Sequence, residues 1–350
     1  MGLKLGILDQ SPIFPGETGT EAFRRTVGLA RYAEQWGYHR FWVSEHHDSD
    51  RLAGSSPEVL MAYLLACTER IRIGSGGVML QHYSPYKVAE NFNVLASLGP
   101  GRVDLGIGRA PGGLPRSTRA LQQGKSDPLS LQDKIVELQK YIHDALEADH
   151  PLAGLRATPV PQKPAEIYIL GSSPGSAEIA AKLGLPYVFS QFISNDEEVA
   201  HAAIQTYRSG FLAENGRKPY PILALSVIVA DTDKEAKELA GEQKIVKIRL
   251  ASGNVLTVRS VEQAEEFGRQ TNEEYTIDIQ QASVIQGSQD TIRRKFAELN
   301  EKFGVHEYIV TTAVQDFAKR LRSYELLIEA LEGMVERTVA HGLKVEEAGI

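Results

Sequence analysis

The residues of this chain best suited to chemistry are two adjacent histidines after a short apolar run, in Ser44-Glu45-His46-His47-Asp48. Imidazole and carboxylate groups can bind metals, and Asp50 follows two residues later. Neighbours in an extended segment point to opposite sides, so both histidines cannot easily bind one ion, and no metal is predicted. A single imidazole, with an unperturbed pKa of about 6.5, can act as a general base or hold a charged intermediate. His46 and His47 can equally well satisfy buried polar neighbours, and local sequence does not decide between these roles.

A second candidate is the small-residue turn Gly171-Ser172-Ser173-Pro174-Gly175-Ser176. Small residues allow a ligand to approach the backbone, and the unpaired N–H groups and dipole of a helix start favour an anion. Gly171, Ser172, Ser173 and Ser176 therefore form a candidate phosphate cradle. Because the turn has neither a Walker lysine nor the GxGxxG spacing, an ordinary capped turn also explains it.

Arg109 lies in the glycine-rich segment from Gly106 to Gly113, at the end of another apolar run. A guanidinium that emerges into such a loop can pair bidentately with a phosphate. A structural salt bridge to Asp104 or Glu45 is the competing explanation.

Gly76 and Gly77 end the apolar run Gly74-Ser75-Gly76-Gly77-Val78, where an ordinary strand favours β-branched residues. Glycines at this place indicate unusual dihedrals or a close approach of the backbone to a flat ligand. A simple turn that ends the strand accounts for them as well.

These candidates need a scaffold that brings the ends of several strands together. Short β-rich runs alternate with segments of helical period, the pattern of repeated βα units around a parallel sheet. Barrel enzymes place their chemistry on the loops after the strands, and all of these candidates lie there. Further polar residues at strand ends can line the same pocket or stabilise its loops: Asp9, Gln10, Ser11, Gln81 and His82. Eight strands are expected, the number that closes an α/β (TIM) barrel: Leu3–Leu8, Phe41–Glu45, Ile71–Gly76, Val103–Gly108, Glu166–Gly171, Tyr187–Gln191, Ile222–Ala230 and Glu307–Thr311.

Helix starts support this alternation. An N-cap residue followed by proline occurs at Ser56-Pro57, Ser84-Pro85, Asp127-Pro128 and Ser173-Pro174. Thr18 with Glu21 three residues later predicts a capping box at the start of the first helix.

The chain is expected to form one barrel domain over residues 1–350, with an insertion before the last strand. Between Ala230 and Glu307 lie more residues than one helical return needs. We expect the extra sequence, around 241–285, to form a lid over the strand ends, although a solvated loop is an equal alternative.

Composition restricts the partners. Lys and Arg total 38 against 45 Asp and Glu, which gives a formal net charge of -7. Such a surface disfavours nucleic acid and anionic membranes as partners, and no segment is long and apolar enough for an export signal or a membrane span. Cys67 is the single cysteine, which rules out an intramolecular disulfide and a thiolate cluster and fits the reducing cytoplasm.

Taken together, these segments resemble the bacterial luciferase-like flavin monooxygenase family, and more closely its non-luminescent branch. The resemblance runs in order from Leu3 to about Leu331. It is carried by Phe41-Trp42-Val43-Ser44-Glu45-His46-His47, Arg72-Ile73-Gly74-Ser75-Gly76-Gly77-Val78, Ser84-Pro85, Glu90-Asn91, Gly99-Pro100-Gly101-Arg102-Val103-Asp104-Leu105-Gly106-Ile107-Gly108-Arg109, Gly171-Ser172-Ser173, Gln286-Gly287-Ser288 and Ile309-Val310-Thr311.

The resemblance implies FMN as cofactor, delivered reduced by a separate flavin reductase and used with O2 to oxidise a small organic substrate. It implies that Arg109 holds the FMN phosphate with Gly171, Ser172, Ser173 and Ser176. It also implies a cis peptide between Gly76 and Gly77 beneath the flavin ring, and His46 as the active-site histidine. Bacterial luciferase has a reactive cysteine where this chain has Gly108, so thiol control of the oxygen chemistry is not expected.

Two alternatives remain at this stage. Some relatives use the deazaflavin F420 for hydride transfer without oxygen, and a flavin-binding protein without catalysis can use the same scaffold. A homodimer is expected by analogy with the family, with the apolar helical faces of Glu58–Thr68 and Lys87–Ser97 as one way to form it, although packing on the barrel explains those faces as well.

Overall fold

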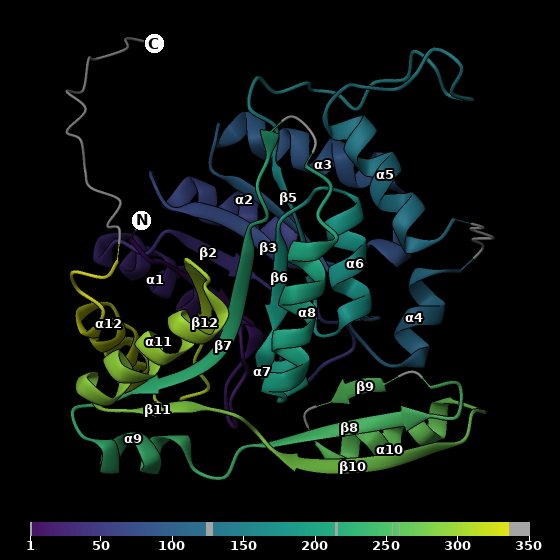
Figure 1. Ribbon diagram of the computed structural model, residues 1–350. Coiled ribbons are helices and arrows are strands. Elements are labelled where there is room, and N and C mark those ends of the chain that lie inside the picture. Colours follow the sequence, from purple (N-terminus) through teal and green to yellow (C-terminus); the bar gives the residue numbers. More distant parts are fainter. Residues whose placement is uncertain (1, 124–128, 214–215, 254, 259, 336–350) are drawn as a thin grey trace.

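The computed structural model describes residues 2–123, 129–213, 216–253, 255–258 and 260–335. Eight parallel strands form a closed ring in the order β1-β2-β3-β4-β5-β6-β7-β12, and β12 pairs with β1 to close it (Figure 1). The eight-stranded α/β barrel expected from the sequence is therefore confirmed. The ring strands are β1 (Lys4–Asp9), β2 (Arg40–Val43), β3 (Arg72–Val78), β4 (Val103–Ile107), β5 (Glu166–Gly171), β6 (Tyr187–Ser190), β7 (Pro221–Val229) and β12 (Glu307–Thr311).

Helices return the chain between the strands and cover the outside of the ring. Along the described residues, no helix is long and apolar enough to cross a membrane. The helices are α1 (Gly19–Trp36), α2 (Pro57–Cys67), α3 (Pro85–Leu98), α4 (Pro115–Leu121), α5 (Leu131–Ile142), α6 (Pro174–Lys182), α7 (Gln191–Ser194), α8 (Glu197–Ser209), α9 (Asp233–Ala240), α11 (Gln289–Phe303) and α12 (Phe317–Ala330), with a short 3-10 helix η1 (Leu80–His82) after β3.

The expected helix starts are confirmed where the structure describes them. Ser56, Ser84 and Ser173 are N-cap residues followed by proline. The Thr18 side chain accepts from the Glu21 N–H, and the Glu21 carboxylate accepts from the Thr18 N–H, which completes the capping box. The pair Asp127-Pro128 lies outside the described residues.

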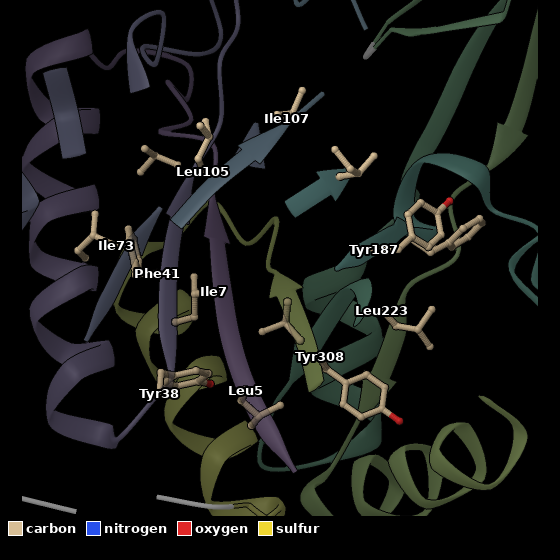
Figure 2. Close-up of a cluster of buried hydrophobic side chains, with 14 of the residues drawn as sticks. Leu5, Ile7, Tyr38, Phe41, Ile73, Leu105, Ile107, Tyr187, Leu223 and Tyr308 are labelled. Atoms are coloured by element: carbon tan, nitrogen blue, oxygen red, sulfur yellow. The ribbon is translucent and has the colours of Figure 1, made fainter. Parts of the chain in front are cut away.

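Alternation along each strand divides the core into two parts. Outward side chains such as Ile7, Phe41, Ile73 and Leu105 come from four neighbouring strands and pack under the helices (Figure 2). Inward side chains fill the barrel itself, so the ring is a packed core. A site is therefore expected at the carboxyl ends of the strands, on the loops that follow them. The inward set is Leu8, Trp42, Tyr168, Val188, Ile222, Ala224 and Ile309.

Buried charges occupy the amino-terminal end of the barrel, opposite the candidate site. Arg40 is 2% exposed, lies 2.6 Å from a carboxylate oxygen of the fully buried Asp104, and also pairs with Glu307. Asp104 additionally accepts from Arg72 and from the Trp42 indole N–H, 2.9 Å away. This cluster is balanced by its own hydrogen bonds and anchors four strands to one another.

The sequence before the last strand forms a unit of its own, below the ring in Figure 1. An antiparallel sheet of β8 (Lys244–Leu250), β9 (Val255–Val258) and β10 (Tyr275–Gln281) packs on α10 (Val261–Gln270) around Val246, Ile248, Ala264 and Phe267. β11 (Ile285–Gly287) then returns the chain and pairs with β7 outside the ring. We refer to residues 244–281 as the insertion.

Candidate active site

Glu45, at the end of β2, organises the residues around it. Its side chain is 1% exposed and accepts hydrogen bonds from the Tyr83 hydroxyl at 2.7 Å and from the Met79 N–H at 3.0 Å. His47 Nε2 lies 2.7 Å from the same carboxylate, and the His47 ring meets the His82 ring edge-on. His47 is therefore bound into a polar cluster that joins β2 to the end of β3.

The two adjacent histidines diverge, as expected for an extended segment. The His46 N–H donates to the Gly54 carbonyl oxygen, and the His46 side chain lines a cavity of about 850 Å3, which we call the His46 pocket. The pocket lies between the loop after β2, the start of α1, the Leu114–Arg116 segment and α10. Among the described residues, no three His, Cys, Asp or Glu side chains gather in a way that can hold a metal ion.

The glycines at the end of β3 are required by the packing around them. The Gly76–Gly77 peptide is cis, as the resemblance implies. A Cβ at Gly77 would lie 2.7 Å from the Gly106 carbonyl oxygen, and one at Gly76 would lie 2.7 Å from the Leu8 side chain. Side chains are thus excluded here by β4 and by the barrel core, whatever ligand lies above them.

The turn after β5 forms a compact cradle. The Ser176 hydroxyl donates to the Ser173 carbonyl oxygen at 2.7 Å and lies 2.9 Å from the Tyr187 hydroxyl. A Cβ at Gly171 would fall 2.0 Å from Ser176 Oγ, so glycine is needed there. At Gly175, in the first turn of α6, an added Cβ would meet no described atom within 4 Å, which leaves the helix start open. Ser176 is 5% exposed, so it shapes the cradle from behind.

Arg109 is exposed at the end of β4 and lines a small cleft together with Ser176 and Ile179. Burial raises the pKa of Tyr187 to about 12, and the nearby Arg109 guanidinium opposes that rise, which places its charge close to the cradle. The carboxylates proposed as its salt-bridge partners bind other groups: Asp104 pairs with Arg40 and Arg72, and Glu45 takes the donors named above.

The loop that carries Arg109 is held by η1. The Gln81 side-chain amide donates to the carbonyl oxygens of Arg109, at 3.1 Å, and Ala110, at 2.5 Å. His82 is fully buried, and its Nε2 lies 2.8 Å from the Pro111 carbonyl oxygen. These two residues thus stabilise a loop, the second of the roles that their strand-end position predicted.

Asp9 and Ser11 also stabilise the rim. Asp9 is 1% exposed, pairs with Arg320 at 3.0 Å, and accepts from the Ser11 N–H at 2.9 Å. Ser11 has a φ of 49°, and this hydrogen bond secures its turn. Tyr187 and Tyr83 were not expected in the site, because no local signal in the sequence marks a side chain that reaches a neighbouring loop.

The strand ends retain polar atoms that suit a bound ligand. Within the described part of the chain, Ser44 Oγ, Gln81 Oε1 and Gln191 Oε1 are buried without a hydrogen-bond partner. Buried acceptors and hydroxyls of this kind normally meet water or a ligand. Together with the exposed Arg109 and the open start of α6, they fit an anionic, hydrogen-bonding cofactor such as FMN.

The closed ring with its polar strand ends defines an α/β-barrel enzyme architecture, and the chain belongs to the luciferase-like monooxygenase family, whose sequence pattern matches residues 3–307. It is 40% identical over 330 residues to the N-acetyl-S-alkylcysteine monooxygenase of Bacillus subtilis, covering 94% of this chain and 98% of that protein. The crystal structure of apo-MsnO8 is 34% identical, covers 94% of this chain and 98% of that one, and superposes with a TM-score of 0.77.

A more distant structure has the same fold. The oxygenating component of 3,6-diketocamphane monooxygenase from Pseudomonas putida, in complex with FMN, is 19% identical, covers 96% of this chain and 99% of that chain, and superposes with a TM-score of 0.69. The family expected from the sequence is therefore confirmed, and with it the assignment of the chain as a monooxygenase enzyme.

Proposed function

We propose that this enzyme uses reduced FMN and O2 to oxidise a small organic substrate, with the reduced flavin supplied by a separate reductase. The observation that carries the proposal is the meeting of Arg109, from the end of β4, with the Ser173–Ser176 turn, from the end of β5. A guanidinium beside an open helix start is an arrangement that binds a phosphate monoester. Gly171 and Ser172 complete the turn, and Gly76 and Gly77 offer a surface without side chains for the flavin ring.

When bound, reduced FMN supplies the electrons and the reaction with O2. The residues of this chain bind and orient the flavin and the substrate, and they exclude water. His46 is half-buried and faces the pocket, where its imidazole can accept or donate a proton on the substrate side. Glu45 and His47 act behind it, because their mutual hydrogen bond keeps the β2 loop in position.

The insertion is proposed to act as the lid. Leu114 packs into its apolar core, and the Arg116 N–H donates to the Gln270 side chain at 2.9 Å. On another edge, Lys247 Nζ donates to the Ser194 carbonyl oxygen at 2.9 Å. The insertion is thus connected to the Arg109 loop and to α7, which suits a cover that keeps water from the flavin.

The substrate class suggested by the 40% identical relative is a thioether of a modified cysteine. We propose that this chain also acts on a thioether and that the sulfur is the atom it oxidises. The competing functions are F420-dependent hydride transfer and flavin binding without catalysis, and the experiment below distinguishes them from the proposal.

We also propose a homodimer formed through α2 and α3. Val59, Tyr63, Val94 and Leu98 on these neighbouring helices are 70%, 60%, 44% and 65% exposed. Large apolar side chains exposed on two helices in contact with each other are typical of an interface. The single cysteine, Cys67, suits a reducing compartment, so we propose that the dimer works in the cytoplasm.

The proposal is tested by anaerobic titration of the purified protein with reduced FMN, followed by mixing with oxygenated buffer and a thioether. Tight binding and formation of the sulfoxide, with one NADH consumed per product when a reductase is present, would support it. Failure to bind reduced FMN together with binding of F420 would replace it by hydride transfer. Binding with immediate peroxide release for every thioether tried would indicate a carrier.

A further inference from the structure

The two walls of the His46 pocket present different charged groups. On the wall formed by α10 and the start of α4, Glu266 lies 2.6 Å from Arg269 and 3.9 Å from Arg116. All three residues line the pocket, and the two arginine side chains are more than half exposed. Because two guanidiniums share the Glu266 carboxylate, both retain N–H groups that a ligand's carboxylate can accept from, beside the second carboxylate of this wall, Glu262.

The facing wall is acidic. Asp48 and Asp50 line the pocket from the loop after β2. Arg51 on the same loop faces Glu262 of α10: hydrogen bonds from Ser260 and the Glu262 backbone, and in smaller part the charge of Arg51, hold the pKa of that carboxyl below its usual value. The two aspartates outnumber Arg51 on this loop, so the wall keeps a net negative charge.

Apolar side chains also line the pocket. Ile13, Phe23 and Leu52 line the pocket near His46, and Leu114 lines it beside Arg116. A ligand that fits this arrangement has an anionic group, a hydrogen-bond-donating nitrogen and an apolar substituent, all within a volume of about 850 Å3.

We propose that the His46 pocket binds a substrate built on an amino-acid skeleton, with its carboxylate on Arg116 and Arg269 and its nitrogen facing Asp48 and Asp50. The apolar substituent lies against Ile13, Phe23 and Leu52. This inference rests on the proposed function, because it assigns the residues that select the substrate of the same site.

The carboxylate contact is tested by calorimetric binding of N-acetyl-S-benzylcysteine and its methyl ester to the protein loaded with oxidised FMN. The acid should bind roughly tenfold more tightly than the ester, the effect of a charge-assisted contact at a partly exposed site. Replacing both arginines, Arg116→Gln with Arg269→Gln, should bring the acid to the level of the ester and leave the ester unchanged. The paired lysine replacements should restore most of the difference.

Arg119→Gln is the matched control. Arg119 lies one turn after Arg116 and donates to the Gln270 carbonyl oxygen, but it does not belong to the described residues that line the pocket. Its loss should leave both affinities unchanged. If the wild-type protein binds acid and ester alike, or if the arginine replacements weaken both equally, the inference is overturned.

The nitrogen contact is tested with 3-(benzylsulfanyl)propanoic acid, which lacks the nitrogen, and with free S-benzylcysteine, which carries it as an ammonium. The acid without nitrogen should bind several-fold more weakly than both nitrogen-bearing acids. Free S-benzylcysteine should bind more tightly than its acetylated form, because its ammonium faces two carboxylates, and Asp48→Asn with Asp50→Asn should remove that difference. Asparagine suits position 48, where φ is 51°. Equal affinities for the three acids in the wild-type protein would overturn this part.

Turnover separates the inference from the proposed function. Charge-dependent binding without oxidation of any thioether would contradict the monooxygenase proposal and leave the substrate site standing. Oxidation of acid and ester with equal KM would support the monooxygenase and remove the charged subsite.

Discussion

The hydroxyl groups of Ser176 and Tyr187 lie 2.9 Å apart, and both lie within hydrogen-bond distance of the Ser173 carbonyl oxygen, at 2.7 and 3.2 Å. A side chain from β6 therefore supports the backbone of the turn after β5. The cradle proposed for the FMN phosphate depends on this support, because the turn must keep its first N–H groups directed outward.

Tyr187→Phe should weaken FMN binding roughly three- to tenfold and lower the free energy of unfolding by about 0.5–1.5 kcal/mol, the net value of a buried hydrogen bond. Fluorescence titration measures the first effect and chemical denaturation the second. Tyr207→Phe is the control, since the Tyr207 hydroxyl donates to the Leu185 carbonyl oxygen at 2.9 Å in the same packed group of rings. Tyr207→Phe should lower the free energy of unfolding by a similar amount without changing the FMN affinity. An equal loss of FMN affinity in both variants would show that Tyr187 has no specific role in the cradle.

Arg109→Ala should weaken FMN binding by about 1.5–3 kcal/mol, the range of a hydrogen bond to a charged group, with little effect on stability because the side chain is exposed. Riboflavin has no phosphate, so its affinity should not change. The comparison is made by titrating both flavins into both proteins. An unchanged FMN affinity would remove Arg109 from the phosphate site.

His46→Ala should leave FMN affinity within about twofold and divert reduced flavin from product to hydrogen peroxide, since the imidazole faces the substrate side of the pocket. The readout is the ratio of product to peroxide as a function of pH. His47→Ala is the contrasting variant: it removes the 2.7 Å bond to Glu45 and should chiefly lower the melting temperature. If the His46 variant keeps full coupling at every pH, this histidine is structural.

Asp104→Asn should destabilise the fold by about 3–5 kcal/mol, because it removes the buried carboxylate that pairs with both Arg40 and Arg72 and leaves Glu307 to balance Arg40 alone. Burial alone would raise the pKa of Asp104, but the guanidiniums of Arg40 and Arg72 hold it below its usual value. A lowered folded pKa means that the stabilisation is complete above the unfolded pKa of about 3.9 and is lost as the pH falls through the folded value. The difference between wild type and variant in urea unfolding should therefore be constant from pH 8 to about 5 and shrink in stronger acid.

Asp144→Asn serves as its control. Asp144 pairs with Arg156 at 2.6 Å on the surface, where ion pairs contribute about 0–1 kcal/mol. Its positive φ of 53° is compatible with asparagine. A loss at position 144 as large as that at position 104 would contradict the distinction between buried and exposed pairs.

Tyr63→Asp should convert the proposed dimer to a monomer, because it puts a charge into the apolar face of α2, where Tyr63 is 60% exposed. Sedimentation velocity at several protein concentrations measures the change. Tyr32→Asp on α1, at 43% exposure, is the matched substitution away from that face and should leave the association state unchanged. A wild-type protein that sediments as a monomer at all concentrations would remove the interface.

Local sequence patterns were sufficient to predict the barrel and to place the candidate site residues on loops after its strands. The alternation of β-rich runs with capped helical segments predicted all eight ring strands, since period, caps and turn residues are properties of neighbouring residues along the chain. The same holds for the insertion before the last strand, which was visible as an excess of length, whereas its antiparallel sheet was not.

Only the tertiary structure decided which polar residues share a site. The local sequence does not assign different surroundings to His46 and His47, yet one lines a pocket and the other binds Glu45. Gln81 and His82 hold the Arg109 loop, and Tyr187 supports the turn after β5 from another strand. Sequence determines periodicity and the position of each loop, while closure of the ring sets which loops meet, because contacts between strand ends far apart in the chain depend on register and packing.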